Sequence, residues 1–196
     1  MYILEEHMEE KKKSEDTECY ETDRLYIRHF KVDDTASCMV GWGQDRNLNR
    51  FIMGYPMTRE EMQSFVEIFS ENENAWLIKE KKNNNSIGYV TIDISCPQLQ
   101  IGEIGYVIGE KYQNRGYAYE AIVKLLNIYF EQKNMYMIEA KYNEINICSA
   151  KLLKKLGFQI DGILRERRID METMERKNMI VCSITNREMT DQHNNV

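Results

Sequence analysis

A short polar loop between an expected strand and an expected helix carries the clearest chemical signal in the sequence. The segment 113–118 reads QNRGYA; it follows an alternating apolar run and precedes an amphipathic stretch. The first N–H groups of a helix have no partner within it, and together with the helix dipole they attract anions. Gly116 would let the backbone approach a phosphate, and Arg115 could add positive charge. The loop fits a pyrophosphate site, although one glycine before a helix is equally typical of a simple turn.

The elements that would hold this loop follow from hydrophobic periodicity. Apolar residues alternate in several segments, as in half-buried strands, and recur with helical spacing in others. A strand, a helix and a second strand follow one another over 101–142, which implies a right-handed parallel crossover. The expected strands are 22–30, 75–80, 87–94, 101–108, 135–142, 158–168 and 177–185. We expect one mixed α/β domain of the α+β class, with a mostly antiparallel sheet of six to seven strands and helices on both faces.

Local signals mark where the helices begin and end. Thr58 is followed by Glu61 at the spacing of a capping box, before an amphipathic run. Asn146 is a favoured residue at a helix N-terminus, and Gly157 is typical of a helix C-terminus. These signals predict one helix from residue 59 and another that starts at Asn146 and stops at Gly157.

Three segments together resemble a known family. The loop 113–118 matches the Q/R-x-x-G-x-G/A signature of the GNAT acetyltransferase superfamily. Upstream, ETDRLYIR at 21–28 resembles the E-T-x-R-L-x-x-R opening of its ribosomal-protein N-acetyltransferase branch. Downstream, NICS at 146–149 and LGF at 156–158 resemble the N-x-x-S…L-G-F segment of that branch. The resemblance covers residues 21–189 and implies an N-acetyltransferase that uses acetyl-coenzyme A (acetyl-CoA) as cosubstrate.

The resemblance also implies where the acetyl donor binds. In that family the pantetheine arm enters a gap between splayed parallel strands and pairs with a strand backbone. The pyrophosphate rests on loop amides, and an asparagine bonds to the arm, although Asn146 is equally explained as a helix cap. The implied donor-binding residues are Tyr106, Val107 and Ile108 for the pantetheine, Gln113, Asn114, Arg115, Gly116, Tyr117 and Ala118 for the pyrophosphate, and Asn146.

Two further residues match catalytic positions of the family. Glu103 matches a base that deprotonates the amine directly or through water, although a strand carboxylate is the plain alternative. Ser149 matches the residue proposed to meet the thiolate sulfur, although a serine in the first turn of a helix has a local explanation as well. Many members carry a tyrosine general acid where this chain has Leu153. That departure, which the ribosomal-protein branch shares, favours Ser149 in the role.

Composition excludes several other classes of function. The net charge is −6, and residues 1–20 hold three lysines against seven acidic residues, so the body of the chain has no basic excess for nucleic acid. The loop matches neither GxGxxG nor GxxxxGK[ST], which argues against dinucleotides and nucleoside triphosphates. Five scattered cysteines without CxxC spacing predict no metal site and no disulfide framework. No apolar run is long enough to span a membrane, so we expect a cytoplasmic protein.

The acceptor is the part of the function on which the sequence is silent. We expect a charged tail at 1–20, a catalytic domain at 21–189 and a short tail at 190–196, in a monomer or a homodimer. The acceptor would be a primary amine, on a protein N-terminus or on a small molecule. In the family the segments corresponding to 34–69 and 165–177 select it. The alternative function is a catalytically inactive domain that binds coenzyme A as a sensor or scaffold.

Overall fold

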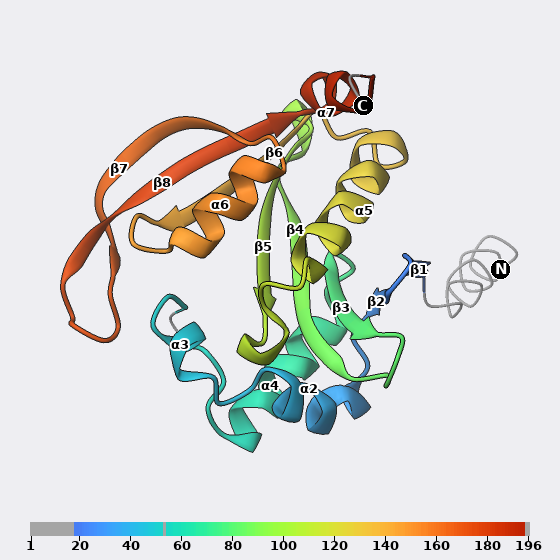
Figure 1. The fold of residues 1–196 in the computed structure, drawn as a ribbon, viewed down its shortest axis with the longest axis vertical. Helices are drawn as coiled ribbons and strands as arrows, with labels where there is room; N and C mark the ends of the chain where they lie inside the picture. Colours follow the sequence, from blue (N-terminus) through green and yellow to red (C-terminus); the bar gives the residue numbers. More distant parts are fainter. Residues whose placement is uncertain (1–17, 53, 195–196) are drawn as a thin grey trace, which may run out of the picture.

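The computed structural model describes residues 18–52 and 54–194 and places their strands in one twisted sheet (Figure 1). The order across the sheet is β1-β2-β3-β4-β5-β6-β8-β7. Within the described part of the chain, β5 and β6 form the one parallel pair, and the other neighbours are antiparallel. The strands are β1 (Cys19–Glu21), β2 (Leu25–His29), β3 (Ala75–Glu80), β4 (Ser86–Cys96), β5 (Ile101–Ile108), β6 (Met137–Asn143), β7 (Gln159–Ile169) and β8 (Arg176–Thr185).

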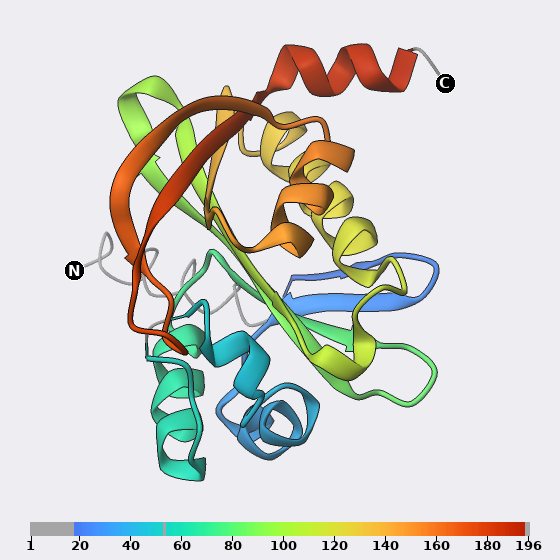
Figure 2. The same cartoon turned by 60° about the vertical axis from the view of Figure 1, so that its left-hand side comes forward.

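Helices cover both faces of this sheet (Figure 2). The helices α5 (Tyr117–Glu131) and α6 (Ile147–Lys155) lie on one face, and α2 (Thr35–Gly41) and α4 (Arg59–Ser70) lie on the other. The short α3 (Arg46–Asn49) follows α2, and α7 (Asn186–Asn194) follows the last strand. Three 3-10 turns, η2 (Val32–Asp34), η3 (Pro97–Leu99) and η4 (Glu110–Tyr112), connect the elements.

Each face of the sheet has its own apolar core among the described residues. On the α5 and α6 face, Ile104, Ile108 and Ile138 pack against helix residues such as Leu125 and Leu153. The opposite core is rich in aromatic side chains and is built on α2 and α4; its buried members include Phe30, Trp42, Tyr89 and Val107. Because successive strand residues point to opposite faces, β5 contributes to both cores. That strand is therefore held firmly from both sides.

The predicted fold class is confirmed, and one feature of the sheet differs from expectation. The mixed α+β architecture and its parallel crossover are as predicted. The sheet has eight strands rather than six to seven, because residues 19–21 pair with 26–28 at its edge. A three-residue strand is too short to show alternation, so its partner rather than its own sequence defines it. The rest of the predicted tail, residues 1–17, lies outside the described residues.

The predicted helix ends agree with the structure. Thr58 accepts a hydrogen bond from the Glu61 amide at 3.2 Å, and Glu61 accepts from the Thr58 amide at 2.9 Å, which completes the capping box. Asn146 precedes the first residue of α6 and accepts from the Ser149 amide. Gly157 follows α6 with a φ of 90°, the left-handed conformation that glycine adopts without a steric cost.

The parallel pairing of β5 with β6 is short, and this shapes the centre of the molecule. It runs from Ile101 opposite Met137 to Ile104 opposite Ala140 and ends there. Beyond that point β5 stays paired with β4 as far as Ile108, and β6 stays paired with β8 as far as Asn143. The two strands therefore part, and a gap opens in the sheet between 105–108 and 141–143.

One glycine sets how closely β4 approaches β5 beside this gap. A Cβ atom on Gly88 would lie 2.0 Å from the Val107 carbonyl oxygen, well inside contact distance. We expect Gly88→Ala to destabilise the protein by about 1–3 kcal/mol, because the backbone of one strand must shift. Urea unfolding measures this. Gly162→Ala on β7 is the matched control, since its Cβ would meet nothing within 4 Å; equal stability of the two variants would contradict the prediction.

Candidate active site

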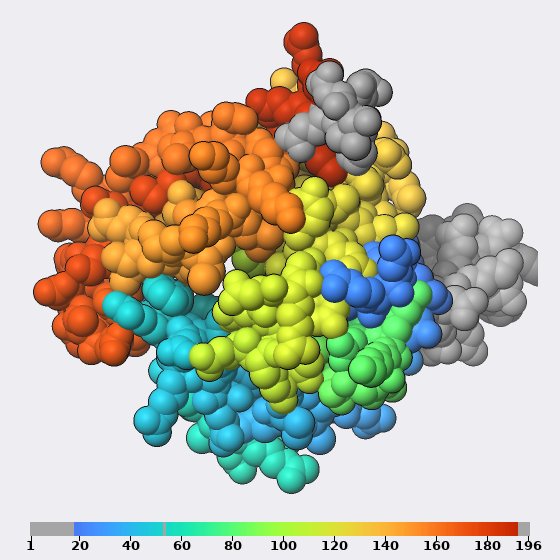
Figure 3. Space-filling view, in the orientation of Figure 1, coloured from blue at the N-terminus to red at the C-terminus, as the bar shows by residue number. Residues whose placement is uncertain are grey.

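The gap between β5 and β6 lies at the junction of α6, the loop before α5, and α3. The space-filling view shows a hollow where these three segments meet (Figure 3). Among the described strands, none fills the space between 105–108 of β5 and 141–143 of β6. A ligand with amide groups could hydrogen-bond to the exposed backbone edge there, much as an added strand would.

The loop before α5 presents free amides beside this gap. Asn114 and Gly116 have φ values of 57° and 82°, and alternation of left-handed with ordinary conformations turns successive N–H groups toward one side. No acceptor among the described residues is recorded for the amides of Asn114, Arg115 or Gly116. The first intrahelical bond of α5 is from Glu120 to the Gly116 carbonyl at 3.0 Å, which leaves the amides of the first turn without helical partners.

Gln113 differs from the other predicted pyrophosphate-binding residues. Its backbone amide donates to the Glu110 carbonyl at 3.1 Å, and its side chain donates to the Ile108 carbonyl at 2.9 Å. Its amide is thus engaged within the protein. The side-chain bond ties the loop to the end of β5, so Gln113 fixes the loop relative to the gap.

The N-terminus of α6 faces the gap and carries two of the predicted residues. Asn146 Oδ1 accepts from the Ser149 amide at 3.1 Å, which caps the helix. Ser149 Oγ lies 2.7 Å from the hydroxyl of Tyr106 on β5. Burial raises the pKa of Tyr106 above its ordinary value, against a smaller opposing effect of the Ser149 bond, so this phenol stays protonated at neutral pH. Tyr106 and Ser149 thus form a hydroxyl pair that connects α6 with β5.

Glu103 lies on the other face of β5. Since residues 104, 106 and 108 face α5 and α6, Glu103 and Val107 face the side of α2 and α4. Glu103 Oε2 accepts from Lys141 Nζ at 2.5 Å, and its side chain is 37% exposed. The structure therefore brings together Tyr106 with Ser149, but it places Glu103 on the opposite side of the sheet with a lysine partner. No pattern in the sequence indicated Lys141 as that partner.

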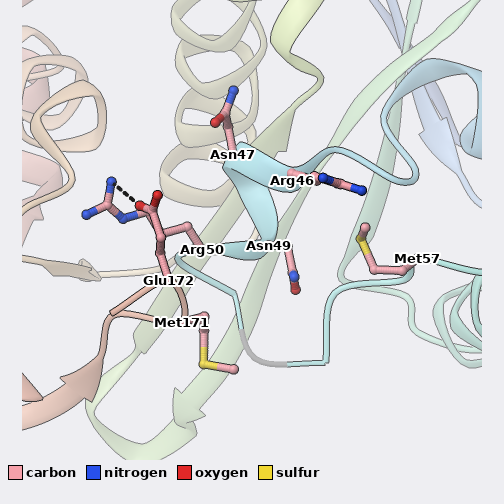
Figure 4. Close-up of a pocket in the computed structure, with 7 residues that line it drawn as sticks. All are labelled: Arg46, Asn47, Asn49, Arg50, Met57, Met171 and Glu172. Atoms are coloured by element: carbon pink, nitrogen blue, oxygen red, sulfur yellow. Dashed lines mark ion pairs between the residues drawn. The ribbon is translucent and has the colours of Figure 1, made fainter. Parts of the chain in front are cut away.

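A pocket of about 340 Å³ lies between α3 and the turn that joins β7 to β8 (Figure 4). Arg50 connects its walls: its guanidinium bonds to both carboxylate oxygens of Asp170, at 2.9 and 2.7 Å, and to Glu172 at 2.9 Å. Asp170 is 1% exposed, and the hydrogen bonds from Arg50 hold its pKa below the ordinary value. The pocket is lined by Arg46, Asn47, Asn49, Arg50, Met57, Met171 and Glu172.

Cys182, the buried cysteine of β8, offers no nucleophile beside the gap. Cys182 is 2% exposed, its thiol donates to the Ala140 carbonyl, and burial raises its pKa to about 12. A thiol in that state does not supply a thiolate at neutral pH. Within 18–52 and 54–194, no three His, Cys, Asp or Glu residues cluster as metal ligands, and no helix is long and apolar enough to cross a membrane.

Two side-chain contacts, one at the loop and one between β5 and β6, were not recognised from the sequence. Arg24 and Glu120 lie beside it, although they are 96 positions apart, and Arg24 also contacts the Arg115 carbonyl. Lys141 pairs with Glu103 across neighbouring strands. Arg24 belongs to the segment 21–28, whose resemblance to the family was recognised. Its contacts with Glu120 and Arg115 could not be predicted from that resemblance.

Comparisons with known proteins identify the family. The family model described as "Acetyltransferase (GNAT) domain" matches residues 24–159. An uncharacterized N-acetyltransferase p20 of Bacillus licheniformis is 30% identical over 151 residues, which cover 74% of this chain and 84% of that protein.

Two solved structures share the fold. A ribosomal-protein-S5-alanine acetyltransferase from Vibrio fischeri aligns with a TM-score of 0.73 at 21% identity, and covers 86% of this chain and 97% of that one. The Microcin C7 self-immunity acetyltransferase MccE, solved in complex with acetyl-CoA and AMP, aligns with a TM-score of 0.72 at 21% identity, and covers 84% and 93%.

The positive φ at Gly116 yields a direct test of the loop. We expect Gly116→Val to weaken binding of coenzyme A on the order of a hundredfold, because a β-branched residue strains this conformation and displaces the amides around it. Isothermal titration calorimetry measures the affinity. Gly54→Val is the control, since Gly54 also has a positive φ, of 73°, but no neighbour within 4 Å. Unchanged affinity in Gly116→Val would remove the loop from the site.

Proposed function

Because the chain belongs to the GNAT acetyltransferase family and is an N-acetyltransferase that uses acetyl-CoA, we propose that it passes the acetyl group directly to a primary amine within a ternary complex. The observation that carries this proposal is the gap between β5 and β6, with free loop amides at one end and a hydroxyl pair at its side. Direct transfer is favoured over an acyl-enzyme at Cys182 because that buried thiol is held protonated.

The donor would lie along the gap. The pantetheine amides would pair with the backbone of Tyr106, Val107 and Ile108, which β6 leaves unpaired. The pyrophosphate would bind the amides of 114–118, where the helix dipole of α5 adds to the attraction. Asn146 would contribute its side-chain NH2 group to the pantetheine, since its Oδ1 already caps α6. Gln113 would act through its bond to Ile108 rather than through its amide.

The acceptor amine must lose a proton before its nitrogen attacks the thioester carbonyl carbon. We assign this step to Glu103, acting directly or through one water, from the α2 and α4 side of the sheet. Lys141 is bound to one oxygen of that carboxylate, Oε2, and the second oxygen remains for the amine or the water. The Lys141 ammonium would also hold the carboxylate in a fixed orientation.

Ser149 would serve the other end of the reaction. When the tetrahedral intermediate collapses, the carbon–sulfur bond breaks and the sulfur leaves as a thiolate, which needs a proton or a hydrogen bond. Ser149 can donate a hydrogen bond from its hydroxyl to the thiolate sulfur, and so stabilise it, while it accepts a hydrogen bond from Tyr106. The raised pKa of Tyr106 keeps that phenol a donor throughout the neutral range.

The acceptor would enter from the side of α3 and the β7–β8 turn. The Arg46 and Arg50 pocket there combines guanidinium, carboxylate, amide and thioether groups, which could hold the polar groups beside the amine of a small molecule or the backbone of a protein N-terminus. Likeness in fold to a ribosomal-protein acetyltransferase supports the protein N-terminus. Five free cysteines support a reducing, cytoplasmic setting.

A thiol-release assay with a panel of amines tests the proposal. Free coenzyme A should form only when acetyl-CoA and a suitable amine are both present; the panel would include N-terminal peptides of ribosomal proteins and small polyamines. The second candidate, an inactive coenzyme A-binding domain, is favoured if acetyl-CoA raises the melting temperature but no amine releases thiol.

Removing the Glu103 carboxylate should slow chemistry more than donor binding. We expect Glu103→Gln to lower kcat by a factor of ~10²–10⁴, because a positioned general base usually raises the rate by that factor. The affinity for acetyl-CoA should be unchanged. The loss should be greatest at low pH, because α-amines and lysine amines, with pKa values near ~8 and ~10.4, are then most protonated. Rates measured from pH 6 to pH 9.5 check both points.

The matched control for this variant lies on the neighbouring strand. Glu139 is the register partner of Glu103 and lies 3.9 Å from the same lysine. Glu139→Gln makes the same change in charge and should leave kcat within about twofold. If both variants behave alike, Glu103 is a structural carboxylate.

Removing the Ser149 hydroxyl should lower kcat less than removing the Glu103 carboxylate does. A coenzyme A thiol with a pKa of ~8–9 is a tolerable leaving group, so we expect Ser149→Ala to lower kcat by roughly ten- to a hundredfold. Tyr106→Phe should cost less than this, because Ser149 keeps its own proton to donate. Single-turnover rates measure both variants; full activity in Ser149→Ala would leave water as the proton source.

A further inference from the structure

Arg24, just before β2, reaches across the structure to the loop before α5. Its guanidinium Nη1 donates to the Arg115 carbonyl at 2.9 Å, from 91 positions away in the chain. Its Nε and Nη2 groups contact Glu120 Oε2 on α5, each at 2.6 Å. The same guanidinium lies 4.6 Å from the centre of the Tyr117 ring, within the range of a cation–π contact. One side chain thus touches the loop, the helix that follows it and the first aromatic residue of that helix.

Glu120 is the fixed point for this contact. Besides Arg24, its carboxylate accepts from the Thr22 hydroxyl at 2.6 Å and from the Arg24 backbone amide at 3.0 Å. Burial opposes ionisation of Glu120, but these hydrogen bonds outweigh it and lower the pKa of the carboxyl. The carboxylate is therefore charged at neutral pH, and it holds the guanidinium in one orientation.

The bond to the Arg115 carbonyl determines where the next amide points. The peptide between Arg115 and Gly116 is planar and trans, so its C=O and N–H point in opposite directions. Arg24 holds the carbonyl on its own side, and the Gly116 N–H therefore points away from Arg24. This is one of the amides for which no acceptor is recorded among the described residues.

The same residue limits the other movements open to the loop. A Cβ atom on Gly116 would lie 3.3 Å from Arg24 Nη2, so the guanidinium packs directly against this glycine. The ring of Tyr117 is held beneath Arg24, and the Tyr117 hydroxyl donates to Glu80 on β3. Both loop residues with positive φ, Asn114 and Gly116, thus flank a peptide that is bound from outside the loop.

We propose that Arg24 is a positioning residue of the donor site: it sets the loop amides for the pyrophosphate before the cofactor arrives, with Glu120 as its anchor. This inference rests on the proposed donor site. The reason is energetic, since a loop ordered in advance does not lose conformational entropy on binding. Arg24 itself has its charge paired and three donor groups engaged within the protein.

A purely structural ion pair would behave differently. The Arg24 side chain is 46% exposed, and exposed ion pairs contribute little to folding stability. If Arg24 only stabilises the fold, its removal leaves the affinity for coenzyme A unchanged and has little effect on the stability of the protein or on the chemical step. If it positions the loop, affinity falls while stability and the chemical step stay nearly constant.

The first experiment measures coenzyme A binding to Arg24→Gln by titration calorimetry, which needs no amine. We expect Kd to rise about ten- to a hundredfold with little change in the melting temperature. Arg24→Lys should recover part of the affinity at most, because one ammonium cannot bind Glu120 and the Arg115 carbonyl in the same fork. In turnover, KM for acetyl-CoA should rise while kcat at saturation stays within about threefold.

Arg28, four residues further along on β2, supplies the matched control. It makes a bidentate pair with Asp34, at 2.8 and 2.6 Å, and is more buried than Arg24, with 17% of its side chain exposed. Arg28→Gln should lower the melting temperature more than Arg24→Gln and leave Kd within about twofold.

Glu120→Gln tests the anchor. We expect it to raise Kd in the same direction as Arg24→Gln, and the double variant should be little weaker than either single one, since both act on one contact. Equal Kd values in Arg24→Gln, Arg28→Gln and the wild type would overturn the proposal. A wild-type protein that binds no coenzyme A would instead overturn the donor site on which it rests.

Discussion

The limited hydrogen bonding between β5 and β6 is the constraint on which the rest of the structure depends. These parallel strands share only the stretch from Ile101 to Ile104. Each is nevertheless paired along its other edge, β5 with β4 and β6 with β8, so neither can swing over to close the gap. Both faces of β5 are buried in separate cores, which adds to this restraint. An opening within a sheet is costly unless a ligand satisfies its edges, and in our proposal the acetyl donor is that ligand.

The groups assigned to chemistry are divided between the two faces by that opening. Tyr106 and Ser149 meet on the side of α5 and α6, whereas Glu103 and Lys141 meet on the side of α2 and α4. This follows from strand alternation, because 103 and 106 differ by an odd number of positions. A proton could therefore be taken from the amine on one side and delivered to sulfur on the other, without the two groups competing for each other.

Local sequence patterns predicted most helices and strands, but they did not predict the side-chain contacts between distant segments. Alternation gave seven of the eight strands, and the caps at Thr58 and Asn146 gave two helix starts, because these signals are contained in a few consecutive residues. The strand at 19–21 and the helix α7 were not predicted, since one is too short for a period and the other is mostly polar. The Tyr106–Ser149, Arg24–Glu120 and Lys141–Glu103 contacts join residues 43, 96 and 38 positions apart. A pattern within one short segment does not indicate contacts between residues so far apart in the sequence.

The pair formed by Arg50 and Asp170 has a consequence for altering this protein by loop grafting. Arg50 ends α3, Asp170 begins the turn between β7 and β8, and the Met171 amide also donates to the Arg50 carbonyl at 3.2 Å. These contacts join the two walls of the pocket, so the walls are not independent loops. A hairpin transplanted from a relative would keep the pocket in shape only if its turn brought a carboxylate to the position of Asp170. The exchangeable part of this hairpin therefore excludes Asp170, Met171 and Glu172, each of which contacts Arg50.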